Sequence, residues 1–394
     1  MLNRLLQPQV VEFIKRQEKS TLKPADYDRL LFNKSKHPNI PMELVVDQLR
    51  ARQKAKAKLP QWFQTDGIIM PPLLSMEQCS SEITAEYKSN LIQGNLAIDL
   101  TGGAGVDSYY LSKKFKQVIY VDFNKDLVEI AAHNFRLLGA SNIEVVHANS
   151  EEYIANFKGV ADCIYVDPAR RNQDQKVFLF EDCSPNIVKI QPNLLQKAKM
   201  VLVKASPMLD ITKGVSQLAN VAEVVVVALK NEVKELLFIQ KKANSPKTKV
   251  SAVDIAYDYS FTAELDSKED VAVAEISIYL YEPAASILKI GKTDQLAVEF
   301  DLHKLNKNTN LYSSNLLRND FPGRKFKVDK VLKYNKKQIL AAIGTNQANI
   351  AVRNFTDTVE EFRKKIGLKP GGSVYLFGIR DIKNNLQVLV CSKI

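Results

Sequence analysis

The chain has 394 residues, of which 45% are hydrophobic and 25% are charged. This composition is typical of a folded protein of two or three domains and excludes a wholly disordered or fibrous chain. Four scattered cysteines and four histidines form neither a disulfide framework nor a zinc signature, and no apolar run approaches the roughly 20 residues that cross a bilayer. The first sixteen residues lack the apolar core of a signal peptide, so we expect a cytoplasmic protein with no metal and no membrane partner.

The charge is concentrated at the two ends of the chain. The formal net charge is +11, and residues 1–75 hold 13 basic and 7 acidic residues, whereas residues 320–394 hold 15 and 6. The stretch between them is therefore mildly acidic, at −4. Basic ends of this kind are typical of proteins that bind a polyanion, although lysine-rich faces that are simply solvated produce the same pattern.

Residues 1–75 are predicted to be helical. Two segments, VVEFIKRQ and MELVVDQLRARQKAKAK, carry apolar residues at three- and four-residue spacing. Pro24 and Pro41 stand where helices would begin, and Pro60 and the Pro71-Pro72 pair close the region. We treat these residues as an N-terminal helical region.

Residues 76–242 alternate short apolar runs with helical stretches. Seven runs are predicted to be strands: 96–100, 118–122, 143–148, 163–167, 200–206, 223–229 and 235–240. The first five are separated by segments long enough for crossover helices, which predicts parallel pairing and a Rossmann-like α/β fold. Only a few residues join the last two runs, so we expect an antiparallel hairpin at the edge of this seven-stranded sheet.

The pattern changes again after residue 242. Residues 243–320 alternate weakly and then become loop-like, and Phe321-Pro322-Gly323 marks a further boundary. The last segment, 321–394, combines strands with two predicted helices at 336–344 and 358–367. We interpret it as a small α+β module.

A glycine-rich segment follows the first predicted strand. Residues 99–107 read DLTGGAGVD, and the glycines at Gly103 and Gly105 permit a positive φ and let a ligand lie against the backbone. A dinucleotide fingerprint would need a further glycine where Ser108 stands, which disfavours a bound pyrophosphate. A glycine-rich turn of this kind also occurs in many α/β proteins without such a ligand.

Polar residues also follow the next two strands. Asp122 ends the second strand, where a carboxylate can accept both hydroxyls of a ribose, and Asn149 follows the third, near the position of an adenine edge. Each residue has a simpler interpretation, because Asp122 can cap the next helix and Asn149 can terminate a strand. Their register on consecutive strands favours a shared nucleoside site.

The fourth strand ends in the sequence DPARR at 167–171. Asp167 can accept a hydrogen bond or a proton from a nucleophile such as an exocyclic amine, and Arg170 and Arg171 have the planar fork that suits phosphate. The alternative is a helix cap followed by two solvated arginines.

Taken together, these motifs resemble those of class I S-adenosylmethionine-dependent methyltransferases. More closely, the chain is similar to a bacterial family of such enzymes with a ferredoxin-like insert and a C-terminal THUMP-like domain. That second resemblance rests on four segments: EQCSSEITAEYK at 77–88, FPGRKF at 321–326, NIAVRNF at 349–355 and GGSVYLF at 371–377. It implies a methyltransferase domain at 76–242, a ferredoxin-like or linking domain at 243–320 and a THUMP-like domain at 321–394.

The resemblance implies a set of residues that bind S-adenosylmethionine. In this set Asp99 and Asp107 lie near the methionine end of the cofactor, and Phe123 covers the adenine. The full set is Asp99, Thr101, Gly103, Gly105, Asp107, Asp122, Phe123 and Asn149. Thr101 departs from the family pattern, because many members have glycine there, and Asn149 stands where many have aspartate.

The resemblance also implies an RNA substrate, either rRNA or tRNA, methylated at a base nitrogen by direct in-line transfer. Asp167 and the carbonyl of Pro168 would orient the nitrogen, while Arg170 and Arg171 would hold a phosphate. Covalent uracil chemistry is disfavoured, since residues 204–207 read KASP where a nucleophilic cysteine would be needed. Two alternatives remain open: an RNA-binding assembly factor without transfer activity, and a methyltransferase acting on protein or a small molecule. The oligomeric state is also open.

Overall fold

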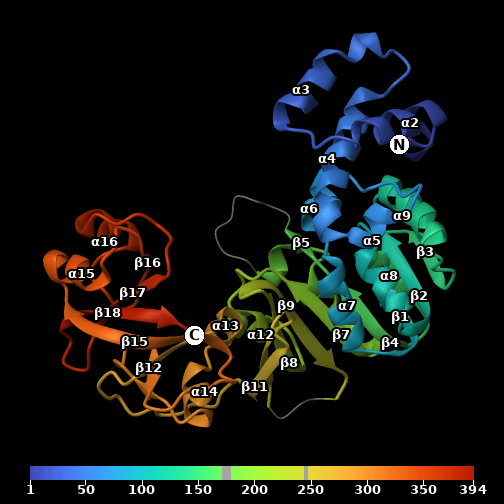
Figure 1. Cartoon of the computed structure of the whole chain (residues 1–394). Coiled ribbons are helices and arrows are strands. Elements are labelled where there is room, and N and C mark those ends of the chain that lie inside the picture. Colours follow the sequence, from blue (N-terminus) through green and yellow to red (C-terminus); the bar gives the residue numbers. More distant parts are fainter. Residues whose placement is uncertain (171–178, 244–246) are drawn as a thin grey trace. The chain divides into compact units, whose positions relative to one another are not determined.

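The computed structural model describes residues 1–170, 179–243 and 247–394 (Figure 1). The chain forms two compact units. The first comprises residues 1–222 and 236–246, and the second comprises residues 223–235 and 247–394. Within the described ranges, none of the helices has the length and apolar character needed to span a membrane.

Seven α-helices begin the first unit. They are α1 (Leu2–Leu5), α2 (Pro8–Gln17), α3 (Pro24–Phe32), α4 (Met42–Lys58), α5 (Pro60–Gln64), α6 (Leu73–Gln78) and α7 (Glu82–Asn90). The two helices predicted from apolar spacing are confirmed as α2 and α4. Proline opens α2, α3 and α5, because its fixed φ suits the first helical turn, where its missing N–H costs nothing.

The N-terminal helices share a core with the sheet layer. Trp62 of α5 packs with Tyr109 and Tyr110, and the same buried cluster includes Ala51 of α4 and Tyr120 of the sheet. A second cluster joins α1, α2 and α4 to Ile130, which lies on α9. The segment before the sheet is therefore packed as part of the first unit, and the division predicted at residue 75 remains a prediction.

Six strands of a mixed sheet lie wholly or mostly in the first unit. They are β1 (Gly94–Asp99), β2 (Phe115–Asp122), β3 (Ile143–His147), β4 (Ala161–Val166), β7 (Ala198–Ala205) and β9 (Glu232–Lys241). The order is β3-β2-β1-β4-β7-β9, with β9 antiparallel and the others parallel. The chain reverses its direction of travel across the sheet between β1 and β4, and open α/β sheets bind ligands at the carboxyl edge beside such a switch point.

Helices connect the parallel strands as predicted. They are α8 (Val106–Ser112), α9 (Lys125–Leu137), α10 (Ser150–Asn156), α11 (Ile187–Lys197) and α12 (Ile211–Gln217). The first of them, α8, is short, since it ends at Ser112 and Phe115 already begins β2. A short ribbon, β5 (Ala169–Arg170) with β6 (Cys183–Ser184), lies outside the main sheet.

The predicted hairpin forms, but it is not the edge of the sheet. Strand β8 (Val221–Leu229) is followed by β10 (Lys249–Asp254) in parallel and by β11 (Tyr259–Glu264), so the order continues β9-β8-β10-β11. The continuous buried run in β8 is the physical reason, because such runs are typical of strands covered on both faces rather than of edge strands. Two strands that the sequence did not predict thus extend the sheet.

The rest of the second unit is built on another mixed sheet. Its order is β13-β14-β12-β15-β18-β17-β16, with all pairs antiparallel except β16 and β17. The strands are β12 (Tyr279–Pro283), β13 (His303–Lys304), β14 (Tyr312–Ser314), β15 (Gly323–Lys333), β16 (Asn349–Val352), β17 (Val374–Arg380) and β18 (Leu386–Lys393). Helices α13 (Ala285–Ile290), α14 (Thr293–Glu299), α15 (Lys336–Ile343) and α16 (Val359–Ile366) accompany it, and the last two confirm both helices predicted in this segment.

Candidate active site

The glycine-rich turn lies at the carboxyl end of β1 and leads into α8. Gly103 and Gly105 have φ values of +52° and +80°, the left-handed region that favours glycine. At Gly102 an added Cβ would lie 2.1 Å from the Tyr120 ring, so the backbone rests directly on that ring. The Tyr120 hydroxyl donates to the Gly103 carbonyl at 2.8 Å, which fixes the shape of the turn.

Asp99 supports this turn from inside the protein. Its carboxylate is fully buried and accepts hydrogen bonds from the Thr101 N–H at 3.0 Å and the Ser108 hydroxyl at 2.6 Å. Burial raises the pKa of Asp99 to about 7, while the Ser108 hydrogen bond opposes the shift. The structure therefore assigns Asp99 a structural role in the turn, and the expected contact with the methionine end of a cofactor remains a prediction.

Asp122 lies beside the turn at the end of β2. Its Oδ2 accepts from the Gly103 N–H and its Oδ1 from the Asn124 N–H, both at 2.8 Å, and burial raises the pKa of this carboxyl. The next residue, Phe123, is 73% exposed although it is aromatic. In this arrangement the exposed ring can stack on a base, and the buried carboxylate can accept hydrogen bonds from a sugar.

Asn149 begins α10 just beyond β3. Its Oδ1 accepts from the backbone N–H groups of Glu151 and Glu152 at 2.9 and 3.2 Å, so it caps the helix, as the simpler interpretation allowed. Asp122 pairs with His147 across β2 and β3, which places Asn149 two residues past the strand position opposite Asp122. The cap uses only the oxygen of the Asn149 side-chain amide. It fixes the orientation of that amide at the carboxyl edge of the sheet, where Asp122 also lies.

Asp167 follows β4 and is tied to the glycine-rich turn. Its backbone N–H donates to the Thr101 hydroxyl at 2.7 Å. Thr101, which stands where many family members have glycine, thus links the ends of β1 and β4. Asp167 Oδ2 accepts from Lys204 Nζ at 2.5 Å. Sequence reasoning considered residues 204–207 only for a missing cysteine and overlooked this lysine, although a lysine near the end of a buried strand is an unusual signal.

The remaining residues of the DPARR segment are only partly described. Pro168 is buried next to Asp167. The backbone of Arg170 pairs with Cys183 in the short ribbon, while its side chain is not described, and Arg171 lies outside the described residues. The expected phosphate contacts of both arginines therefore remain predictions.

Asp107 is the centre of a polar network that sequence reasoning also missed in part. Its Oδ2 accepts from the Ser80 hydroxyl at 2.8 Å and the Tyr165 hydroxyl at 3.1 Å, and Lys88 Nζ lies 3.1 Å from its Oδ1. Burial raises the pKa of Asp107, but the ammonium groups of Lys88 and Lys204 outweigh it, so the net shift is downward. Ser80 and Lys88 lie within residues 77–88. The sequence analysis used this segment only as evidence for the family resemblance and predicted no role for either residue.

The neighbouring cysteine is not a reactive thiol. Burial raises the pKa of Cys79, and its Sγ donates to the Met76 carbonyl at 3.3 Å. Lys58 donates to the carbonyls of Met76 and Glu77 at 3.0 and 2.7 Å, and burial lowers the pKa of this lysine. These contacts hold the 76–79 segment in place and do not indicate a nucleophile.

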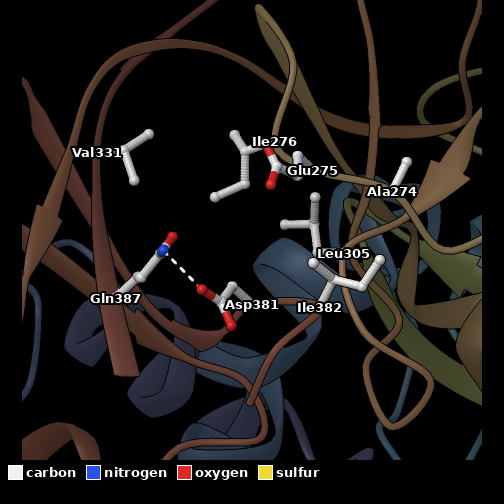
Figure 2. Close-up of a pocket in the computed structure, with 8 residues that line it drawn as sticks. All are labelled: Ala274, Glu275, Ile276, Leu305, Val331, Asp381, Ile382 and Gln387. Atoms are coloured by element: carbon white, nitrogen blue, oxygen red, sulfur yellow. Dashed lines mark hydrogen bonds between the residues drawn. The ribbon is translucent and has the colours of Figure 1, made fainter. Parts of the chain in front are cut away.

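A cavity of about 280 Å³ lies in the second unit (Figure 2). Its lining residues are Ala274, Glu275, Ile276, Leu305, Val331, Asp381, Ile382 and Gln387. Asp381 is already engaged, because it accepts from the backbone N–H groups of Lys383 and Asn385 and from Gln387 Nε2. Among the described residues, those predicted for the site do not line this cavity.

Comparison with known proteins agrees with this geometry. A family model described as "RNA cap guanine-N2 methyltransferase" matches residues 94–170, which run from β1 to Arg170. A ferredoxin-like domain model matches residues 279–322, and a "THUMP domain-like" model matches residues 323–393.

Curated relatives match only part of the chain. It is 33% identical over 95 residues to an uncharacterized RNA methyltransferase of Mycoplasma mobile, covering 24% of both chains, and 25% identical over 162 residues to another of Thermotoga maritima, covering 37% of both. It is also 30% identical over 117 residues to a tRNA/tmRNA (uracil-C(5))-methyltransferase of Nitratiruptor, covering 26% of this chain and 32% of the relative. The chain thus spans between about a quarter and somewhat over a third of the length of these relatives.

One solved structure matches nearly the whole chain. It is described as a "putative methyltransferase from Porphyromonas gingivalis W83", is 30% identical, covers 97% of both chains and has a TM-score of 0.86. The expected resemblance is therefore confirmed over the full architecture, including both domains that follow the methyltransferase fold. The chain belongs to this family of class I methyltransferases with ferredoxin-like and THUMP-like domains.

Proposed function

We propose that the protein transfers a methyl group from S-adenosylmethionine to a base nitrogen of RNA. The observation that carries the proposal is the convergence of Gly103, Asp122 and Asp167 at the carboxyl edge of the parallel sheet, beside its switch point. The RNA methyltransferase names of the partial relatives and the basic ends of the chain support RNA as the substrate class.

The residues at this edge fit the cofactor chemically. The Asp122 carboxylate suits the two hydroxyls of a ribose, the exposed Phe123 ring suits the face of an adenine, and the Asn149 amide suits its edge. Asp107 stands two positions after Gly105, and its Oδ1 is already paired with Lys88 Nζ at 3.1 Å. When bound, S-adenosylmethionine supplies an activated methyl group.

The protein's task is then mainly alignment and charge control. Asp167 accepts a hydrogen bond from the substrate N–H and takes the proton that the nitrogen loses on methylation. Lys204 holds one oxygen of this carboxylate at 2.5 Å, which orients the other oxygen. The carbonyl of Pro168 adds a second acceptor for the same nitrogen.

Methylation at uracil C5 is not the proposed chemistry, despite the Nitratiruptor relative. That reaction needs a cysteine nucleophile, and Lys204 and Ser206 stand at the end of the corresponding strand, β7. We propose rRNA or tRNA as the RNA, with Arg170 and Arg171 holding a phosphate next to the target base.

The decisive experiment measures transfer of labelled methyl from S-adenosylmethionine to total RNA and total protein from a strain that lacks the gene. We expect label in RNA that nuclease removes and protease does not. Protease-sensitive label would show a protein methyltransferase instead. Binding of both cofactor and RNA without transfer would show an assembly factor, and absence of cofactor binding would refute the proposal at its first step.

A further inference from the structure

The cavity in the second unit is built from separate stretches of that unit (Figure 2). Its apolar walls include Ile276 before β12, Leu305 after β13, Val331 on β15 and Ile382 before β18. Val331 and Ile382 are exposed although they are apolar, so the cavity is open to solvent on their side. Its volume of about 280 Å³ is just below the roughly 300–1,000 Å³ typical of small-molecule pockets, which suits a ligand of one or two rings.

Gln387 supplies a buried acceptor to this cavity. Its Nε2 donates to Asp381 Oδ2 at 2.8 Å (Figure 2). Because a carboxylate only accepts, this bond turns the nitrogen of the amide toward Asp381 and leaves the oxygen for another partner. Gln387 Oε1 is buried and has no hydrogen-bond partner among the described residues. Since a buried acceptor without a partner is destabilising, a ligand that donates an N–H would stabilise this arrangement.

The other polar groups of the cavity add no free donor. Asp381 is held by the turn before β18, because its Oδ1 accepts from the N–H groups of Lys383 and Asn385 at 2.9 and 2.8 Å. Glu275 lines the cavity and is exposed, so its carboxylate is a second acceptor. The cavity therefore suits a ligand that brings N–H donors on its edge and apolar faces for the walls.

Exposed lysines surround these acceptors. Lys333 is directly opposite Gln387 in the pairing of β15 with β18, so both side chains lie on one face of the sheet. Lys383 lies in the turn before β18, and Lys307 lies in the loop after β13. Asp329 of β15 is also exposed, and its carboxylate accepts from a serine hydroxyl of β18. The three lysines disfavour a cationic side chain as the ligand and favour N–H donors that are attached to a polyanion.

An unpaired RNA base meets each of these requirements. Its faces are flat and apolar, its edge carries N–H donors, and the phosphates on either side are anionic. Guanine fits the acceptors best, because its N1–H and 2-amino group are adjacent donors, whereas uracil has a single N–H and adenine and cytosine have only an amino group. We propose that the cavity binds an unpaired guanine of the RNA substrate, which donates to Gln387 and Glu275. The three lysines contact its flanking phosphates.

This inference rests on the RNA part of the proposed function and adds recognition of a base by the second unit. The test measures binding of labelled RNA pentamers to the full-length protein by fluorescence anisotropy at low salt. The probes are UUGUU, UUUUU and UUIUU, in which inosine keeps the N1–H of guanosine and lacks its 2-amino group. We expect UUGUU to bind about tenfold more tightly than UUUUU, with UUIUU between them.

Substitutions in the cavity should remove this preference. Gln387→Leu removes the unpaired acceptor and should bring the affinities for UUGUU and UUUUU within about twofold of each other. Glu275→Gln keeps an oxygen acceptor but loses the charge, so it should reduce the preference less. Because Glu275 is exposed, this variant stays informative if Gln387→Leu does not fold. Gln338→Leu, at an exposed glutamine of α15 outside the cavity, should retain the full preference.

Lys333→Met provides the complementary change. It should weaken all three pentamers by a similar factor of about two to five, because a lysine at the rim contacts phosphates and not the base. The salt dependence of binding should fall by about one phosphate contact, and the preference for guanine should remain.

Every other outcome overturns the proposal. Equal wild-type affinities for the pentamers, or a guanine preference that persists in Gln387→Leu, would remove base recognition from this cavity and leave the proposed function intact. Competition with UUGUU by an arginine-containing peptide, lost in Gln387→Leu, would show that the cavity binds protein instead. Binding of total RNA but of none of the pentamers would also overturn this inference alone. Binding of neither would overturn it together with the RNA part of the proposed function.

Discussion

Strands β4 and β7 carry an aspartate–lysine pair at each end. The two pairs differ in the partners of the aspartate and in the exposure of the lysine. At the amino end, Asp162 binds Lys199 at 2.7 Å through Oδ1 and accepts from the N–H groups of Asn95 and Leu96 through Oδ2. At the carboxyl end, Asp167 binds Lys204 through Oδ2 beside the glycine-rich turn.

The exposure of the two lysines shows what the difference means. The Lys199 side chain is 72% exposed, whereas that of Lys204 is 12% exposed, so Lys199 lies at the surface and Lys204 is shielded from solvent. The same two residue types on the same two strands thus serve structure at one end and, in our proposal, chemistry at the other. The direction of the parallel strands decides which end is which.

The largest predicted effect separates these two carboxylates. Asp167→Asn should lower methyl transfer to RNA by a factor of about 10²–10⁴, because the proposed proton acceptor is lost. Asp162→Asn should leave transfer within about twofold. Initial rates with labelled S-adenosylmethionine check both, and binding of RNA by a filter assay should be unchanged in either variant. Equal activity of the two variants would remove Asp167 from the mechanism.

A second prediction compares Asp122, a proposed cofactor-binding residue, with Asp162 as the same control. Asp122→Ala should weaken binding of S-adenosylhomocysteine about 100-fold, since hydrogen bonds to a charged acceptor each contribute about 1.5–3 kcal/mol and the Gly103 N–H also loses its partner. Asp162→Ala should retain the wild-type affinity in the same calorimetric titration. If Asp122→Ala bound S-adenosylhomocysteine with wild-type affinity, Asp122 would not be the residue that holds the ribose.

A third prediction uses the opposite pKa shifts of two carboxyls. Burial raises the pKa of Asp99 to about 7, so its contribution to the free energy of unfolding should be lost as pH rises from about 4 to 7. The Lys199 hydrogen bond and two backbone N–H groups lower the pKa of Asp162 to about 2, so its contribution should be lost as pH falls from about 4 to 2.

Urea unfolding across this pH range tests both signs. Asp99→Asn should flatten the upper part of the stability profile and Asp162→Asn the lower part. If Asp99→Asn leaves the slope between pH 5 and 7 unchanged, Asp99 is not the group that titrates there.

The smallest predicted effect concerns the second unit. Lys327 and Lys330 are exposed on β15, and replacing both by methionine should reduce the salt dependence of RNA binding by about two phosphate contacts, with a loss of only a few fold in affinity at low salt. Binding measured at several salt concentrations checks the slope, and S-adenosylhomocysteine affinity should be unchanged. An unaltered slope would exclude this face from RNA contact.

Local sequence determined much of this protein. The apolar spacing that predicts α2 and α4, the apolar runs of β1 to β4, and the glycine-rich turn all depend on residues close together in the chain. Polar residues that directly follow a strand, such as Asp122 and Asp167, could be placed because the strands are parallel and their carboxyl ends share one edge.

Tertiary structure alone decided which distant residues complete the site. Lys204 and Lys88 lie 37 and 19 positions from the aspartates that they contact, Asp167 and Asp107, and no local period records such a pairing. It also decided that β10 pairs beside β8, where Asp254 at the end of β10 accepts from the backbone N–H groups of Lys230 and Asn231 in the turn after β8. Periodicity reports only which face of an element is buried, whereas the partner of a buried charge depends on how the whole chain packs.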